Sequence, residues 1–400
     1  MGNTYFILIS ICVLVVLSYI FNIISERIRI PSVVLLIATG IGIQFLGKEI
    51  DFPLPNTHFL LELLGVIGLI FIVLEGSLDL NINRSKIPLI TRSLWSAAFI
   101  LLVTSGVVCA VFYHFLSMPF RHALVYAVPL GIISSAIAIP SVNKLSAEKK
   151  EFIIYESTFS DILGIMLFNY VIGLELTGSS TLFQFCSSLS AIIGVSLLST
   201  IVLLFLLNYS KSHAKFYLVF AVLILMYSIS KITHLPSLLL VLIFGVMLNN
   251  AHIFIKGKLA NYLHPEKLKL VTKDLKLITA ETAFIVRTFF FLTFGYTINL
   301  QLLNDSSVFI IGSIIVVTIL LTRYLFLRFI SRTNLFPEMF IAPRGLITIV
   351  LFYSIPLQWE TNLFNEGILL YVIMVSALIM MIALVFTKNR TKVREEVDYE

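Results

Sequence analysis

Long apolar segments alternate with short polar ones along the whole chain. The apolar segments are about twenty residues long, the length an α-helix needs to cross a bilayer, and they end at charged residues, proline or glycine. They predict thirteen helices, at residues 5–24, 30–47, 59–80, 94–116, 121–143, 152–174, 182–208, 214–230, 235–250, 278–297, 307–330, 337–357 and 367–387. The predicted fold class is therefore an all-α polytopic membrane protein with about 13 transmembrane helices.

The composition agrees with this class. Hydrophobic residues make up 58% and charged residues 12% of the 400 residues, and the mean hydropathy is +1.01. A soluble domain has no core large enough to bury so much apolar surface. The expected partner is the lipid bilayer, and no nucleic acid is expected.

The positive charges fall mostly on one side of the predicted helices. Of the 28 Lys and Arg residues, 22 lie in the C-terminal tail and in the loops after odd-numbered helices, whereas three lie in the loops after even-numbered helices. Cytoplasmic loops carry the excess of basic residues. We therefore expect the N-terminus outside, the C-terminus in the cytoplasm, and a bacterial inner membrane as the location.

Two segments resemble two later segments. Residues 30–40 read IPSVVLLIATG and residues 235–245 read LPSLLLVLIFG, with proline, serine and glycine in register. Residues 71–80, FIVLEGSLDL, similarly match residues 291–300, FLTFGYTINL. The matches relate predicted helices 2 and 3 to helices 9 and 10, and a shift by an odd number of helices inverts the second copy. Two inverted six-helix repeats, common in secondary transporters, are therefore predicted.

The repeats give a single transmembrane domain over residues 1–400. Repeat one covers 5–174, a linking helix 182–208, repeat two 214–387 and a short cytoplasmic tail 388–400. The tail is too short for a regulatory nucleotide domain. In the loop before predicted helix 10, helical spacing indicates a short interfacial helix, carried by Leu268, Val271, Leu275 and Ile278.

Each repeat carries a proline inside its fifth helix. Predicted helix 5 contains Ser134, Ser135 and Pro140, and predicted helix 12 contains Pro343 and Arg344. A proline inside a helix removes a backbone hydrogen bond and clashes with the preceding turn. In inverted-repeat transporters, matching helices are broken near the middle of the membrane. We expect helices 5 and 12 to be broken and crossed; two simple kinks are the alternative.

One acidic residue, Asp161, lies in the middle of predicted helix 6. A carboxylate at bilayer depth costs several kcal/mol unless it is paired or functional. At about 1.5 Å rise per residue, Asp161 lies roughly 13–18 Å from the cytoplasmic basic flank. The same estimate holds for Glu75, Ser134, Arg287 and Arg344. These five residues are predicted to share one polar layer.

Three motifs lie in this layer or next to it. Residues 156–168 read ESTFSDILGIMLF, residues 74–76 read LEG and residues 343–345 read PRG. They resemble the E-S-x-x-N-D-x-x-G-I, F-E-G and P-R-G segments of the monovalent cation:proton antiporters, a family that includes sodium/proton exchangers. The resemblance covers essentially the whole chain. It implies a homodimer and an aspartate, Asp161, that binds the cation and the proton alternately.

Two positions depart from the family pattern. Ser160 stands where electroneutral members carry Asn and electrogenic members Asp. A hydroxyl adds no charge, so the resemblance implies electroneutral exchange. The T-D-P of many exchangers matches Ala138-Ile139-Pro140, and residues 134–138 instead resemble the S-S/T-A-I-A of the potassium-efflux branch. The transported cation, Na⁺, K⁺ or Li⁺, is therefore left open.

The expected chemistry is competition at Asp161, which holds the alkali cation transiently. Hard cations prefer oxygen ligands, and burial disfavours a charged carboxylate, so a proton can displace the cation near neutral pH. Ser157 lies one turn before Asp161 and can face the same site, as can Ser160. At the break, Ser134 and Ser135 either contribute ligands or bond their own helix.

Supporting roles are expected for the other buried charges. Glu156 is predicted to pair with Arg344 or Arg287, with cation coordination as the less favoured role. Arg287 is predicted to be a structural ion-pair partner rather than a moving part. Glu75 is expected to bond a helix end, to pair with Arg344 or to act directly in transport. Arg323, close to a helix end, is expected at the interface.

Other functional classes fit less well. An organic-anion symporter with inverted repeats is the alternative, but helices 5 and 12 supply few polar residues for a larger substrate. A channel would need a continuous polar path. No metal-ligand spacing, phosphate loop or nucleophile elbow indicates an enzyme. No cofactor is expected, and the ligands are the transported ions, a monovalent cation and H⁺.

Overall fold

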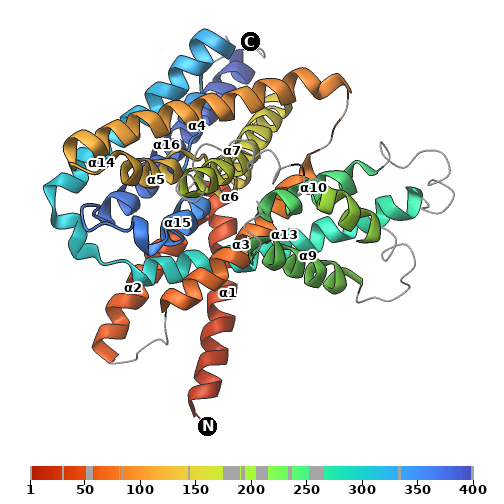
Figure 1. The fold of residues 1–400 in the computed structure, drawn as a ribbon, viewed down its shortest axis with the longest axis horizontal. Helices are drawn as coiled ribbons and strands as arrows, with labels where there is room; N and C mark the ends of the chain where they lie inside the picture. The colour runs from red at the N-terminus through yellow and green to blue at the C-terminus, as the bar shows by residue number, and fades with distance from the viewer. Residues whose placement is uncertain are drawn as a thin grey trace.

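The structure is a computed structural model, in which the described residues are 2–28, 31–50, 57–80, 82, 84–142, 145–173, 190, 194–203, 215–232, 237–251, 265–331 and 335–397. Across these residues the chain is helical with short connections (Figure 1). The first half forms α1 (Gly2–Ile28), α2 (Ser32–Ile50), α3 (Thr57–Asp79), α4 (Ile87–Phe115), α5 (Phe120–Gly131), α6 (Ser135–Ser141) and α7 (Ala147–Gly173). The second half forms α9 (Lys215–Ile232), α10 (Ser237–Asn249), α13 (Pro265–Thr297), α14 (Ser306–Leu325), α15 (Leu346–Tyr353) and α16 (Gly367–Val397). The predicted linking helix lies partly outside the described residues.

Several helices are long and apolar enough to cross a membrane. Six such spans occur within the described residues, at Phe59–Asp79, Ile87–Phe115, Phe120–Ser141, Thr272–Thr297, Ser306–Ser331 and Gly367–Phe386. Large apolar side chains such as Trp95, Leu102 and Leu225 point outward and are exposed. An outward apolar surface over buried polar side chains is the pattern expected of a protein whose solvent is lipid.

The helices pack as two bundles. In the first, called the α13 bundle, α13 packs against α2 and α3, α3 packs against α10, and α1 and α9 lie alongside. In the second, called the α7 bundle, α4 packs against α5, α7 and α14, while α14 packs against α16. Figure 1 shows α9, α10 and α13 on one side of the molecule and α4, α14 and α16 on the other. Contacts of α3 with α6, α7 and α15 join the bundles.

The matched glycines of the predicted repeats occupy matching contacts. A Cβ on Gly40 of α2 would lie 2.2 Å from the Leu292 carbonyl oxygen of α13. A Cβ on Gly245 of α10 would lie 1.7 Å from Ser77 Oγ of α3. Each glycine thus lets its helix approach a helix of the other repeat, as small residues do in membrane bundles. Matched glycines in the two repeats thus make corresponding contacts, which is consistent with the predicted inverted repeat.

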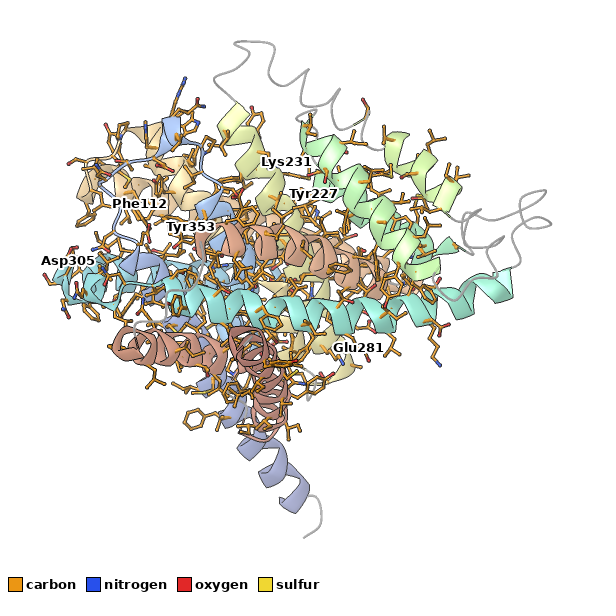
Figure 2. All side chains as sticks on the ribbon, turned by 90° about the horizontal axis from the view of Figure 1, so that it is seen from below. Phe112, Tyr227, Lys231, Glu281, Asp305 and Tyr353 are labelled. Atoms are coloured by element: carbon orange, nitrogen blue, oxygen red, sulfur yellow. The ribbon has the colours of Figure 1, made fainter. Side chains whose placement is uncertain are left out.

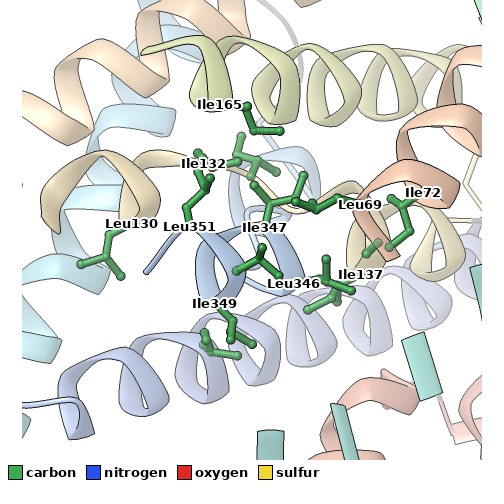
Figure 3. Close-up of a cluster of buried hydrophobic side chains, with 14 of the residues drawn as sticks. Leu69, Ile72, Leu130, Ile132, Ile137, Ile165, Leu346, Ile347, Ile349 and Leu351 are labelled. Carbon is green, nitrogen blue, oxygen red and sulfur yellow. The ribbon is translucent and has the colours of Figure 1, made fainter. Parts of the chain in front are cut away.

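Both predicted broken helices are interrupted and cross. Between α5 and α6 the chain is non-helical at residues 132–134, and between the 3₁₀ turn Glu338–Phe340 and α15 it is non-helical at residues 341–345. The amide of Ser134 donates to the Pro343 carbonyl at 2.9 Å, where the two interruptions meet. Figure 3 shows the apolar side chains around this crossing, including Ile132, Ile137 and Leu346. Simple kinks, the alternative expectation, are wrong.

One predicted break is misplaced. Pro140 lies inside α6 with its side chain exposed, and the interruption precedes Ser135. A proline removes the N–H that would donate to the carbonyl four residues earlier, so Pro140 affects Ala136 and leaves the start of α6 intact. The T-D-P match at residues 138–140 therefore does not mark the crossing.

Several helices are longer than their apolar segments predict, most of all α13 and α16. The predicted interfacial helix is the beginning of α13, which continues without interruption from Pro265 to Thr297. Figure 2 shows α13 running across the molecule, with Glu281 on it and Asp305 beyond its end. At the other end of the chain, α16 continues to Val397, past the predicted end at residue 387.

Candidate functional site

Asp161 lies on α7 where the first broken helix resumes. Its side chain is buried, and Oδ2 accepts a hydrogen bond of 3.3 Å from the Ser135 amide, the first residue of α6. The first amides of a helix lack partners inside the helix and attract negative charge. Oδ1 is also buried and has no hydrogen-bond partner among the described residues. One oxygen of the carboxylate is therefore held by the protein, and the other is available to a proton or a cation.

The predicted hydroxyl ligands differ in what they already bind. Ser160 Oγ accepts from the Ile133 amide at 2.9 Å, so it satisfies a buried N–H in the interruption. Ser157 Oγ donates to the Ile153 carbonyl of α7 at 2.7 Å. A hydroxyl that donates in this way keeps oxygen lone pairs for a cation. Ser134 Oγ is buried without a partner among the described residues.

Arg287 connects the two bundles. Its Nη2 lies 3.5 Å from Glu75 Oε2 on α3, and its Nη1 donates to the Ala136 carbonyl of α6 at 3.4 Å. Pro140 has no N–H to donate to that carbonyl. The structural ion pair predicted for Arg287 is present, with Glu75 as its partner. The predicted pairing of Glu75 with Arg344 is wrong.

A second ion pair is completely buried inside the α7 bundle. Glu156 Oε2 lies 2.6 Å from Arg323 Nη2 on α14, and both side chains have 0% exposure. Glu156 Oε1 accepts from the Ser96 hydroxyl of α4, and Arg323 Nε donates to the Glu338 carbonyl. The prediction that Glu156 pairs with Arg344 or Arg287 is therefore wrong, as is the interfacial position predicted for Arg323.

The error at Arg323 has a physical cause. Beyond Leu325 the chain continues as a π-helical turn, Phe326–Ser331, in which Phe326 and Leu327 are buried. This turn keeps Arg323 more than one turn inside the packed region. The run YLFL that follows Arg323 in the sequence is the signal that would have placed it in the interior.

Arg344 lies between the interruption and α15 and is also completely buried. Its Nε, Nη1 and Nη2 have no hydrogen-bond partner among the described residues. Its backbone amide donates to Ser376 Oγ at 3.1 Å. Arg344 is thus placed at the second broken helix as predicted, but it does not pair with Glu75 or Glu156.

The predicted polar layer comes together around the crossing. Direct contacts join Ser135 to Asp161, Ser134 to Pro343, and Arg287 to Glu75. Sequence reasoning missed the hydroxyl of Thr158, which is buried without a partner among the described residues. A Cβ on Gly76 would lie 3.3 Å from this hydroxyl, so the glycine of the LEG motif leaves room beside α7.

Comparison with known proteins identifies the fold and the family. The family model for the sodium/hydrogen exchanger, transmembrane, matches residues 12–388. The chain belongs to this family. The sodium proton antiporter MjNhaP1 from Methanocaldococcus jannaschii, solved at pH 8, shares the fold with a TM-score of 0.69 and 22% identity, over 94% of this chain and 97% of that chain. A second structure of MjNhaP1, from electron microscopy, gives a TM-score of 0.68 and 20% identity, over 96% of this chain and 95% of that one. No curated protein matches.

Family membership decides between the functional classes. The chain is an integral membrane cation:proton antiporter and not an enzyme. The organic-anion symporter, the alternative expectation, is not supported. The matched region contains all three motifs that carry the resemblance, so the antiporter's buried Asp161, its LEG segment and its PRG segment lie within the family's transmembrane unit.

Proposed function

We propose that the antiporter exchanges one monovalent cation, Na⁺, K⁺ or Li⁺, for one proton by competition at Asp161. The observation that carries the proposal is the buried carboxylate whose Oδ2 is bound by the Ser135 amide while Oδ1 has no partner among the described residues. An unsatisfied buried acceptor costs free energy. A proton or a cation on Oδ1 removes that cost, and the two exclude each other.

The surroundings supply oxygen ligands suited to an alkali cation. Ser157 lies one turn from Asp161 on α7 and keeps lone pairs, and Ser134 carries a buried hydroxyl at the crossing. Hard cations prefer such neutral and anionic oxygens. Ser160 contributes less directly, because its oxygen already accepts from the Ile133 amide. Its proposed role is to hold the interruption in place beside the carboxylate.

The position between two bundles suits alternating access. Asp161 and both broken helices belong to the α7 bundle, whereas Glu75 and Arg287 belong to the α13 bundle. In inverted-repeat transporters, one bundle rocks against the other around a fixed site. Such a movement would expose Asp161 to one side of the membrane and then to the other.

The surroundings of Asp161 also favour one-for-one exchange. Glu75 and Glu156 each have an arginine partner, and Ser160 adds no charge. A loaded site then carries the same charge with a cation as with a proton. We further propose a homodimer in a bacterial inner membrane, with the N-terminus outside and the C-terminus in the cytoplasm, that works without a cofactor.

Proteoliposomes with a trapped pH dye test the proposal. External Na⁺, K⁺, Li⁺ and a bile-acid-like anion are added in turn to vesicles that contain the full chain. We expect proton movement with at least one cation and none with the anion. The matched control is Asp161→Asn, which keeps the shape of the side chain and removes its titration. Proton movement at the wild-type rate in this variant would exclude Asp161 as the exchange site.

A further inference from the structure

Among the described residues, the buried charges around Arg344 do not balance. Arg344 lies within electrostatic reach of Arg323 and Glu156. Glu156 is already engaged through both oxygens, one with Arg323 and one with the Ser96 hydroxyl. Two guanidinium groups and one carboxylate therefore leave this cluster with one excess positive charge. A buried charge without a counter-ion is strongly unfavourable.

The same cluster has donors without acceptors. All three guanidinium nitrogens of Arg344, and Nη1 of Arg323, are buried without a partner within the described part of the chain. A guanidinium group can only donate. Whatever satisfies these nitrogens must therefore supply lone pairs. A cation cannot supply lone pairs and is excluded as the occupant. Asp161 differs from Arg344 in this respect, because its unpartnered Oδ1 is an acceptor.

The start of α15 adds further donors next to Arg344. Gly345, the N-cap of α15, supplies no side-chain hydrogen bond to the first turn. Leu346, Ile347 and Thr348 of that turn are buried, and the Thr348 hydroxyl has no partner among the described residues. The first amides of a helix carry partial positive charge and bind anions. The uncapped first turn thus favours a negatively charged ligand, as the Arg344 guanidinium group does.

We infer that a monovalent inorganic anion of the chloride class binds beside Arg344, at the start of α15. One negative charge balances the cluster and accepts from the guanidinium group. Water supplies lone pairs but leaves the excess charge in place. A rotation of Arg344 onto Glu156 also leaves a net charge of plus one. The cluster would still hold two guanidinium groups and one carboxylate, with Arg323 then unpaired. The anion is a resident structural ligand, separate from the cation exchanged at Asp161.

Thermal unfolding of the purified full chain tests the inference without measuring transport. Sodium chloride, sodium bromide and sodium gluconate are compared at equal sodium concentration and ionic strength, so cation binding is the same in each. A ligand that binds only the folded state raises the Tm in a saturable way. We expect chloride and bromide to raise the Tm by about 2–4 °C over gluconate.

Two variants connect the effect to the site. Arg344→Gln should lose the difference between halide and gluconate. Arg328→Gln is the matched control, because Arg328 lies on the neighbouring π-helical turn with an exposed side chain, and it should keep the difference. A halide effect that persists in Arg344→Gln, or one that is absent from the wild-type chain, would overturn the inference.

Crystals of the wild-type chain grown in bromide decide the matter if Arg344→Gln does not fold. We expect an anomalous bromide peak within hydrogen-bond distance of the Arg344 guanidinium group. A density there without anomalous signal indicates water and contradicts the inference, as does bromide found only elsewhere. None of these outcomes depends on exchange at Asp161, so a failure here is distinguishable from a failure of the proposed function.

Discussion

Arg287 Nη1 donates to the Ala136 carbonyl at 3.4 Å, and this is the carbonyl to which Pro140 cannot donate. The arginine comes from α13 and the carbonyl from α6, so the contact joins the two bundles one residue after Ser135, whose amide donates to Asp161. Arg287 also lies 3.5 Å from Glu75 on α3. The proline therefore does not break the helix; it frees an acceptor for an arginine from the other bundle.

Pro140→Ala should weaken this connection. The new alanine amide can donate to the Ala136 carbonyl within α6, in competition with Arg287. We expect slower exchange by an amount that corresponds to about 0.5–2 kcal/mol of coupling, with no loss of thermal stability. The measurement is the initial rate of cation-driven proton movement in proteoliposomes. Pro88→Ala is the control, since Pro88 lies in the first turn of α4, where no N–H is needed. Equal rates for both variants would contradict the role assigned to Arg287.

Glu156→Gln should destabilise the antiporter strongly. The substitution leaves Arg323 buried and unpaired, which costs about 3–5 kcal/mol. The control is Glu151→Gln, which removes the partly exposed pair with Lys86 and should cost no more than about 1 kcal/mol. Thermal unfolding in detergent compares the two variants. If Glu156→Gln unfolds at the same temperature as Glu151→Gln, the buried pair does not stabilise the fold.

Much of the fold could be predicted because lipid imposes a simple pattern. Each apolar segment of sufficient length must form a helix to satisfy its backbone, so α3, α9 and α10 begin and end near their predicted limits. The beginning of α13 could not be predicted in this way. Its first residues are polar and continue the helix outside the apolar segment, where hydropathy no longer marks the boundary.

The site was predictable where one residue carries the signal. Asp161 stands out because an acid in the middle of a predicted membrane helix is costly unless it is paired or functional, and the structure places it at the break. Pairings were harder to predict, because they depend on which face of each helix meets which neighbour. From the sequence, Glu156 is expected to pair with Arg344 or Arg287, because the position of Arg323 near a helix end predicts that Arg323 lies at the interface. The π-helical turn after α14 keeps Arg323 inside the packed region, and its sign in the sequence is the apolar run YLFL that follows Arg323.

Two serines on α7 should respond differently to removal of the hydroxyl. Ser160→Ala leaves the Ile133 amide without its acceptor, and an unsatisfied buried donor costs about 1–3 kcal/mol. Ser157→Ala removes a donor to a carbonyl of the same helix and should leave stability nearly unchanged. If Ser157 is a ligand, its loss raises the KM for the cation. Unfolding temperature and KM, measured on both variants, separate the two roles; an unchanged Tm in Ser160→Ala would contradict its structural role.

Exchange should be electroneutral. Asp161 carries either one cation or one proton, and the acids nearby are engaged with Arg287 and Arg323. The null point of exchange in proteoliposomes should therefore stay in place when a potassium–valinomycin voltage is imposed. Ser160→Asp adds a second titrating group that couples to the first, and we expect its null point to move with voltage. A clear shift in the wild-type chain would show that a second charge moves with each cycle.

The most direct test of competition at Asp161 is the pH dependence of the apparent KM for the cation, measured from initial exchange rates in proteoliposomes. If proton and cation bind one carboxylate in turn, the KM should rise as the pH falls, by up to about tenfold per pH unit on the acidic side, while the maximal rate at saturating cation stays constant. Asp161→Asn should show no exchange at any pH. A KM that does not change with pH, or exchange that persists in Asp161→Asn, would contradict competition at this residue.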